Sequence, residues 1–60
     1  MENFIKHIRE VGTKYPALQS QLQDLYELTH YEIEDGGSYE GEIEAGYSAI
    51  NDLVEEHLGG

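Results

Sequence analysis

Residues 16–35 read PALQSQLQDLYELTHYEIED, and this stretch decides the fold of the chain. Pro16 suits the first turn of a helix, where its missing N–H would have no partner within the helix. Gly36 and Gly37 follow directly, and two consecutive glycines break a helix. Between these limits, apolar or small residues recur at intervals of three or four, as on one face of an amphipathic helix: Leu18, Leu22, Leu25, Thr29 and Ile33. We therefore predict a helix over residues 16–35.

The apolar side of this stretch is wider than one neighbouring helix would cover. Leu28 and Tyr31 lie beside the main row, which indicates packing against two partners. The chain has 60 residues and no cysteine, so neither a disulfide nor a thiolate zinc site can add to its small core. Because Tyr26, Leu28 and Tyr31 together exceed what one face of a bundle covers, we expect the chain to self-associate in some form.

The segments on either side have the same helical spacing. Asn3 is a suitable N-cap for the first, and Gly12 supplies the left-handed conformation that ends many helices. Ser38 is a suitable N-cap for the last, whose inward face carries a row of mainly apolar residues, Ile43, Gly46, Tyr47, Ile50, Leu53, Val54 and His57. The prediction is one all-α domain over residues 1–60, a three-helix bundle with helices at about 3–11, 16–35 and 38–58.

Two points about the C-terminal half stay open. Gly46 costs about 1 kcal/mol relative to alanine in a helix. Either a close approach by another helix or plain tolerance of the flaw would explain it. Residues 31–34 alternate apolar and polar side chains, Asp35-Gly36 is a turn dipeptide, and residues 39–43 partly continue the alternation. Residues 29–43 could therefore form a β-hairpin instead of a helix, a turn and a helix.

Charge is divided unevenly along the chain. All three bases, Lys6, Arg9 and Lys14, lie within residues 1–14, where two acids reduce the net charge to +1. The remaining residues carry eleven carboxylates and no base, a net charge of −11. Such a surface repels nucleic acids and anionic lipids and attracts basic proteins. No stretch reaches the roughly 20 apolar residues that span a bilayer, and the first residues lack the apolar run of an export signal. We therefore expect a soluble, cytoplasmic protein that binds a basic protein, and neither nucleic acid nor membrane.

The sequence contains no recognisable catalytic or metal-binding pattern. No two of the three histidines have the i, i+4 spacing of a helical metal site. An alignment with an EF-hand loop on Asp35-Gly36 puts Tyr31 and Ile33 at ligand positions, where neither can coordinate calcium. The glycines have neither the spacing nor the lysine of a phosphate-binding loop. We therefore expect a protein that is not an enzyme and that has no metal and no cofactor.

Carboxylates and tyrosines are densest around the second predicted turn. One interpretation is a solvated acidic face that keeps a small domain soluble. The other is an interface in which carboxylates stand where phosphates would be and tyrosines supply apolar anchors. On that second interpretation the partner-binding residues are Tyr31, Glu32, Glu34, Asp35, Tyr39, Glu40, Glu42 and Glu44.

The run from Leu25 to Ser38, continued by Glu42-Ile43-Glu44 and Ile50-Asn51-Asp52-Leu53, resembles the C-terminal halves of short acidic proteins encoded by tailed phages. In these proteins two acidic helices meet at a glycine-serine turn. The resemblance covers about half of the chain and assigns no site residue. In size and charge the chain is similar to phage inhibitors of host nucleases and defence systems, some of which mimic DNA.

That resemblance implies an acidic inhibitor or modulator in the host cytoplasm. Its mechanism would be occlusion of a basic surface on a host nucleic-acid-binding or defence protein. The alternative is a self-associating structural module, a homodimer, whose charge only confers solubility.

Overall fold

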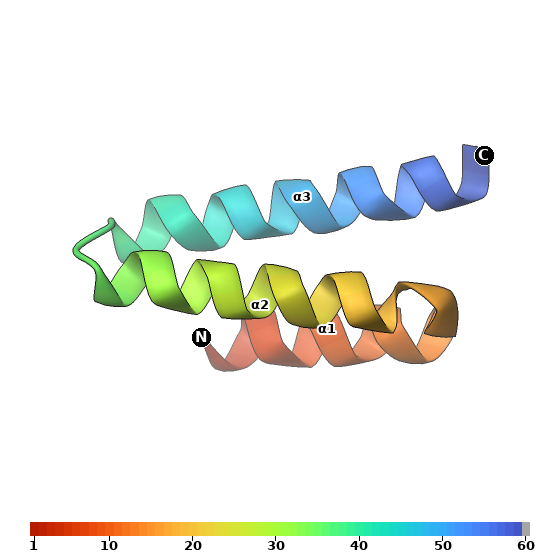
Figure 1. Cartoon of the computed structure of the whole chain (residues 1–60), viewed down its shortest axis with the longest axis horizontal. Helices are drawn as coiled ribbons and strands as arrows, with labels where there is room; N and C mark the ends of the chain where they lie inside the picture. The colour runs from red at the N-terminus through yellow and green to blue at the C-terminus, as the bar shows by residue number, and fades with distance from the viewer. Residues whose placement is uncertain (60) are drawn as a thin grey trace.

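The computed structural model describes residues 1–59, in which three α-helices and one short 3-10 helix follow one another along the chain. Their bounds are α1 Glu2–Lys14, η1 Pro16–Leu18, α2 Gln19–Glu34 and α3 Tyr39–Gly59. The helices lie alongside one another in a bundle that measures 34 × 18 × 16 Å, and α2 packs against both α1 and α3 (Figure 1). The predicted all-α three-helix bundle is confirmed. No strand occurs within residues 1–59, so the β-hairpin alternative is wrong and residues 29–43 form a helix, a turn and a helix.

The core takes side chains from every helix of the bundle. Its buried apolar members are Phe4, Leu18, Leu22 and Ile50. Half-buried side chains surround them, among them Val11, Leu25 and Ile43. Burial of one large apolar side chain contributes about 1.5–3 kcal/mol to stability, so these few contacts hold the three helices together.

The helix α3 passes close to α1 at Gly46. A Cβ atom at this position would lie 2.6 Å from Phe4 Cζ and 2.7 Å from Phe4 Cε2, well inside the ordinary carbon separation of about 3.5–4.0 Å. The Phe4 ring is 1% exposed and stands edge-on to the ring of Tyr47, with 5.3 Å between the ring centroids. Gly46 therefore makes room for a buried ring, and the close approach is the correct one of the two explanations left open by the sequence.

The first helix is longer than predicted. It begins at Glu2, one residue before the predicted start, with Met1 instead of Asn3 as N-cap. It continues through Gly12 to Lys14, so the predicted N-cap and the predicted C-terminal end are wrong. Gly12 is buried, and a Cβ atom there would lie 3.4 Å from Gln19 Cγ. The Gln19 Nε2 group donates a hydrogen bond of 3.1 Å to the Gly12 carbonyl oxygen. Gly12 therefore lies inside α1 against the start of α2, where a Cβ atom would make ordinary contacts, and it does not end a helix.

The second and third helices begin and end near the predicted residues. Pro16 starts a 3-10 turn, and the α-helical hydrogen bonding of α2 begins only at Gln19. In the turn that follows α2, Gly36 has φ +103° and the Gly37 N–H donates to the Glu32 carbonyl oxygen at 2.9 Å. Ser38 accepts a long hydrogen bond of 3.4 Å from the Gly41 N–H, which makes it a weak cap for α3.

Candidate protein-docking surface

The eight residues predicted to bind a partner meet at one end of the bundle. The C-terminal turns of α2 and the N-terminal turns of α3 supply them, and a turn of only four residues, 35–38, joins the two helices (Figure 1). We call them the acidic turn surface, which consists of Tyr31, Glu32, Glu34, Asp35, Tyr39, Glu40, Glu42 and Glu44. All are exposed except Glu42, which is half-buried.

The two tyrosines of this surface offer large apolar areas to solvent. Tyr31 is 66% exposed and Tyr39 is 47% exposed. Tyr26 and Leu28, the other two residues predicted to exceed the bundle face, differ in exposure. Tyr26 is half-buried and stacks on His30, with 6.1 Å between the ring centroids, whereas Leu28 is 57% exposed. Of the three residues predicted to exceed the bundle face, Leu28 and Tyr31 do so and Tyr26 does not.

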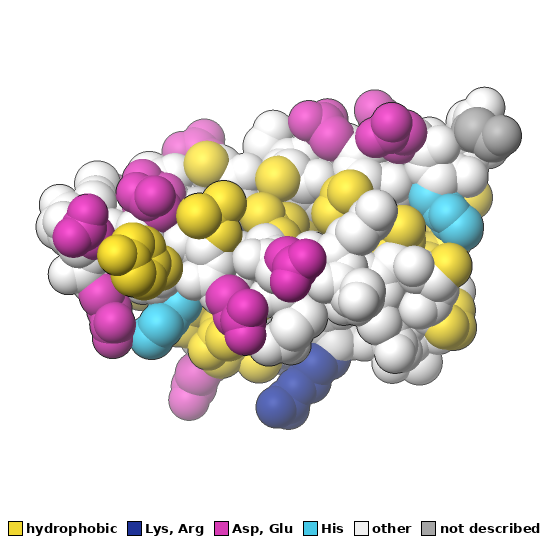
Figure 2. All heavy atoms as spheres, viewed as in Figure 1, with side chains coloured by type: hydrophobic (Ala, Val, Ile, Leu, Met, Phe, Trp, Pro, Cys, Tyr) yellow, Lys and Arg dark blue, Asp and Glu magenta, His cyan; other side chains and the backbone are white. Residues whose placement is uncertain are grey.

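No lysine or arginine within the described residues pairs with a carboxylate of the acidic turn surface. The one contact of salt-bridge length in the described residues joins His30 Nε2 to Glu34 Oε1 at 3.1 Å; it is an ion pair only when His30 is protonated, and both side chains are largely exposed. The bases Lys6, Arg9 and Lys14 all lie on α1, on exposed positions. Figure 2 shows acidic side chains spread over α2 and α3, with basic side chains only at the edge of the molecule where α1 emerges. The segregation of charge along the sequence therefore persists in space.

The helix dipoles stabilise carboxylates on the α3 side of the turn and destabilise them on the α2 side. Glu40 and Glu42 lie in the first turn of α3, where the positive end of the dipole stabilises them. Glu32, Glu34 and Asp35 lie at the negative end of α2, where each carboxylate is disfavoured by a few tenths of a kcal/mol, up to about 1 kcal/mol. Helix stability alone would thus select bases at these three positions. The acids there need another explanation.

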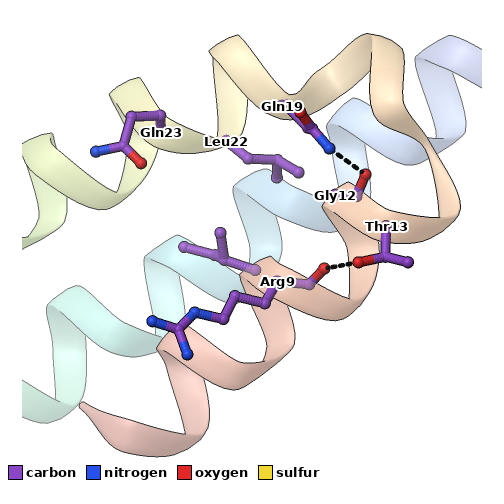
Figure 3. Close-up of a pocket in the computed structure, with 7 residues that line it drawn as sticks. Arg9, Gly12, Thr13, Gln19, Leu22 and Gln23 are labelled. Atoms are coloured by element: carbon purple, nitrogen blue, oxygen red, sulfur yellow. Dashed lines mark hydrogen bonds between the residues drawn. The ribbon is translucent and has the colours of Figure 1, made fainter.

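The structure shows hollows that the sequence did not indicate. One, of about 400 Å³, lies between α1 and the start of α2 beside Arg9 (Figure 3). Two of its polar side chains are already bound to backbone carbonyl oxygens, Thr13 to that of Arg9 at 2.9 Å and Gln19 to that of Gly12. In a small-molecule site several polar groups converge on one space. In this open hollow few groups do. One of its lining residues is Gly12, which the sequence predicts to end a helix.

The histidines stand against different aromatic rings. His7 packs on Tyr47 and His57 on Tyr15, with centroid separations of 5.2 and 5.6 Å. Among residues 1–59, no three histidine, aspartate or glutamate side chains are placed so that they could hold a metal ion.

No helix in the described part of the chain is both long enough and apolar enough to cross a bilayer. Comparison of the chain with models of protein families, with curated proteins and with solved structures finds no significant match in any of the three.

Proposed function

We propose that this protein is an acidic protein-binding module that docks through the acidic turn surface on a basic surface of another protein. The observation that carries the proposal is the combination of carboxylates that lack a lysine or arginine partner with two exposed tyrosines at one end of the bundle. Three of these carboxylates, at the end of α2, are disfavoured by the helix dipole. A partner that supplies arginine or lysine side chains would compensate that cost.

The partner we propose is a nucleic-acid-binding or defence protein of the host cell, and the effect is inhibition by occlusion. A nucleic-acid-binding surface is built to hold rows of phosphates with arginine and lysine. Carboxylates held at the end of a rigid bundle can take the place of those phosphates, while Tyr31 and Tyr39 supply the buried aromatic area that often dominates binding energy. The resemblance in size and charge to phage inhibitors of host nucleases supports the same choice.

The alternative is a homodimer that has a structural role, and the exposed side chain of Leu28 favours it. Salt distinguishes the two functions. Binding to a basic protein weakens as salt is added, because exposed charges are screened beyond about 10 Å at 0.1 M. A dimer formed through apolar contact is indifferent to salt or strengthened by it.

The test compares two triple charge reversals with the same change in net charge. One variant replaces Glu34, Asp35 and Glu40 by lysine in the acidic turn surface. The control replaces Glu10, Glu27 and Glu55 by lysine, three exposed acids that lie outside the acidic turn surface. Both proteins are used in pull-downs from host lysate at low and high salt, and then in kinetic binding to the protein identified.

We expect the first variant to lose most of its association rate at low salt and less at high salt, and the control to lose far less. Tyr31→Ala and Tyr39→Ala should instead raise the dissociation rate, since loss of a buried aromatic anchor costs on the order of 2 kcal/mol. If both triple variants bind as the parent does at every salt concentration, the acidic turn surface is only a solvated surface and the proposal is wrong.

A further inference from the structure

We infer that the side of the α2–α3 pair opposite α1 is a seat for one basic amphipathic helix of the partner protein. The inference rests on the proposed function, because it specifies which element of a basic partner is bound. It adds a second, apolar contact area that continues from the acidic turn surface along the length of the bundle.

The position of α1 defines this side. On α2, Gln19, Gln23 and Tyr26 line the hollows shared with α1. On α3, Tyr47 and Asn51 line the hollow shared with α1. The opposite sides of α2 and α3 have no helix against them within the described residues. We call the area between them the outer face.

Helical spacing gives the members of the outer face. A hollow of about 230 Å³ between α2 and α3 is lined by Gln21 and Leu53, among others, and marks one end. Steps of four and three residues from Gln21 lead along α2 to Leu25 and Leu28. Steps of four from Leu53 lead back along α3 to Ala49 and Ala45. The outer face therefore consists of Leu25, Leu28, Ala45, Ala49 and Leu53.

This face is apolar and incompletely covered. Leu28 is 57% exposed, Ala45 is exposed, and the other three members are half-buried. Figure 2 looks onto this side and shows hydrophobic side chains along the seam between α2 and α3, with acidic side chains on both sides of them. An exposed row of this kind is the surface on which an additional helix packs, as in a groove that binds an amphipathic helix.

Charge decides which helix fits. By helical position Asp24 borders the outer face on α2, Glu32 continues its row after Leu28, and Asp35 follows the end of α2. On α3, Asp52 and Glu56 lie beside the face, and neither helix contains a lysine or arginine. A helix with an apolar stripe flanked by lysine and arginine would oppose each border with the opposite charge. A second copy of this chain would instead bring two such acidic borders together, and like charges across an interface repel.

Length sets the size of the probe. The 16 residues of α2 extend over about 24 Å at 1.5 Å per residue. The probe is therefore a synthetic peptide of about 16 residues, with leucine at i, i+3, i+4 and i+7 positions and lysine on the flanks. Its two controls are a twin with glutamate in place of lysine, and a scrambled peptide of the same composition that lacks the apolar stripe.

The protein variants are paired in the same way. Leu28→Ser removes the exposed centre of the outer face, and its control is Leu58→Ser, because Leu58 is 65% exposed near the end of α3. Ala45→Arg blocks the face with a bulky cation, and its control is Asn51→Arg on the side of α3 that faces α1. All four positions are exposed, and thermal melts check that each variant remains folded.

We expect the basic amphipathic peptide to bind and to become helical on binding, as measured by calorimetry and circular dichroism. Leu28→Ser should weaken it about sixfold, because it removes the largest exposed apolar side chain of the outer face. Ala45→Arg should weaken it at least as much, because it places a bulky cation where a basic helix would lie. The two control variants should stay within about twofold, and the acidic twin should not bind.

Several results would overturn the inference. If the scrambled basic peptide binds as tightly as the amphipathic one, docking is by charge alone; the proposed function then stands without the helix seat. If no basic peptide binds even at low salt, the proposed function fails as well. If the parent protein dimerises in ultracentrifugation and Leu28→Ser alone abolishes the dimer, the outer face is covered by a second copy.

Discussion

The contact between Gly46 and Phe4 gives the sharpest test of the fold. In Gly46→Ala the new Cβ atom would lie 2.6 and 2.7 Å from two atoms of a ring that is 1% exposed. Ordinary contact needs about 3.5–4.0 Å, so the ring must move by about 1 Å in a packed core. Overpacking of this kind costs typically 1–3 kcal/mol, and a fully buried ring with two close atoms belongs near the upper end.

The same substitution also has a favourable part. Alanine is about 1 kcal/mol better than glycine inside a helix. The net loss we expect is therefore about 2 kcal/mol, which lowers the melting temperature of a domain this small by roughly 8–16 °C.

The measurement is thermal and urea unfolding followed by circular dichroism. Gly41→Ala is the matched control, because Gly41 is exposed on the same helix and a Cβ atom there would meet Ser38 at an ordinary 3.6 Å. It should stabilise by about 0.5 kcal/mol. Phe4→Leu should cost less in the Gly46→Ala background than in the parent, because the two positions share one space. If Gly46→Ala melts above the parent, the close approach described above is wrong.

Three further outcomes follow from the turn, the cap and the histidines. Gly36→Ala should lower stability by about 1–2 kcal/mol in urea unfolding, because φ is +103° and no contact offsets the strain, and an unchanged midpoint would contradict the left-handed turn. Ser38→Ala should cost at most about 0.5 kcal/mol, at the low end for an N-cap, because its hydrogen bond is 3.4 Å long; a loss above 1 kcal/mol would show a stronger cap. Chelation with EDTA should leave the melting temperature unchanged, since no three ligand side chains converge within residues 1–59, and a clear drop would reveal a metal site.

Helical periodicity was sufficient to predict the three helices and their order. The C-terminal end of the first helix was not predictable, because Gly12 can end a helix or lie within one, and the spacing within one segment does not distinguish these two places. The distinction depends on residues outside that segment: Gln19 donates a hydrogen bond to the Gly12 carbonyl oxygen, and α1 continues past Gly12 to Lys14. For the same reason the role of Gly46 became clear only when Phe4 was seen beside it.

The two candidate surfaces also differ in how far the sequence could locate them. The acidic turn surface could be located from the sequence, because its residues are close together along the chain and a short turn keeps them together in space. The outer face could be located only in part. Leu28 stood out as surplus to its own helix, but Ala45 and Ala49 become relevant only once α3 lies beside α2 with a known register. Whether either surface binds a partner stays a prediction.

Because the bundle is elongated, only part of its net charge of −10 acts at any one place on its surface in salt. At the ionic strength of a cell the influence of a charge fades within about 8 Å, whereas the molecule is 34 Å long. Its two ends are then electrically independent, and a partner senses only the carboxylates that it touches. In a dilute buffer of 0.01 M salt the screening length grows to about 30 Å, and all thirteen carboxylates act together. A basic protein in contact with one end would therefore interact with the nearby carboxylates alone at cellular ionic strength, and with the whole net charge of −10 in dilute buffer.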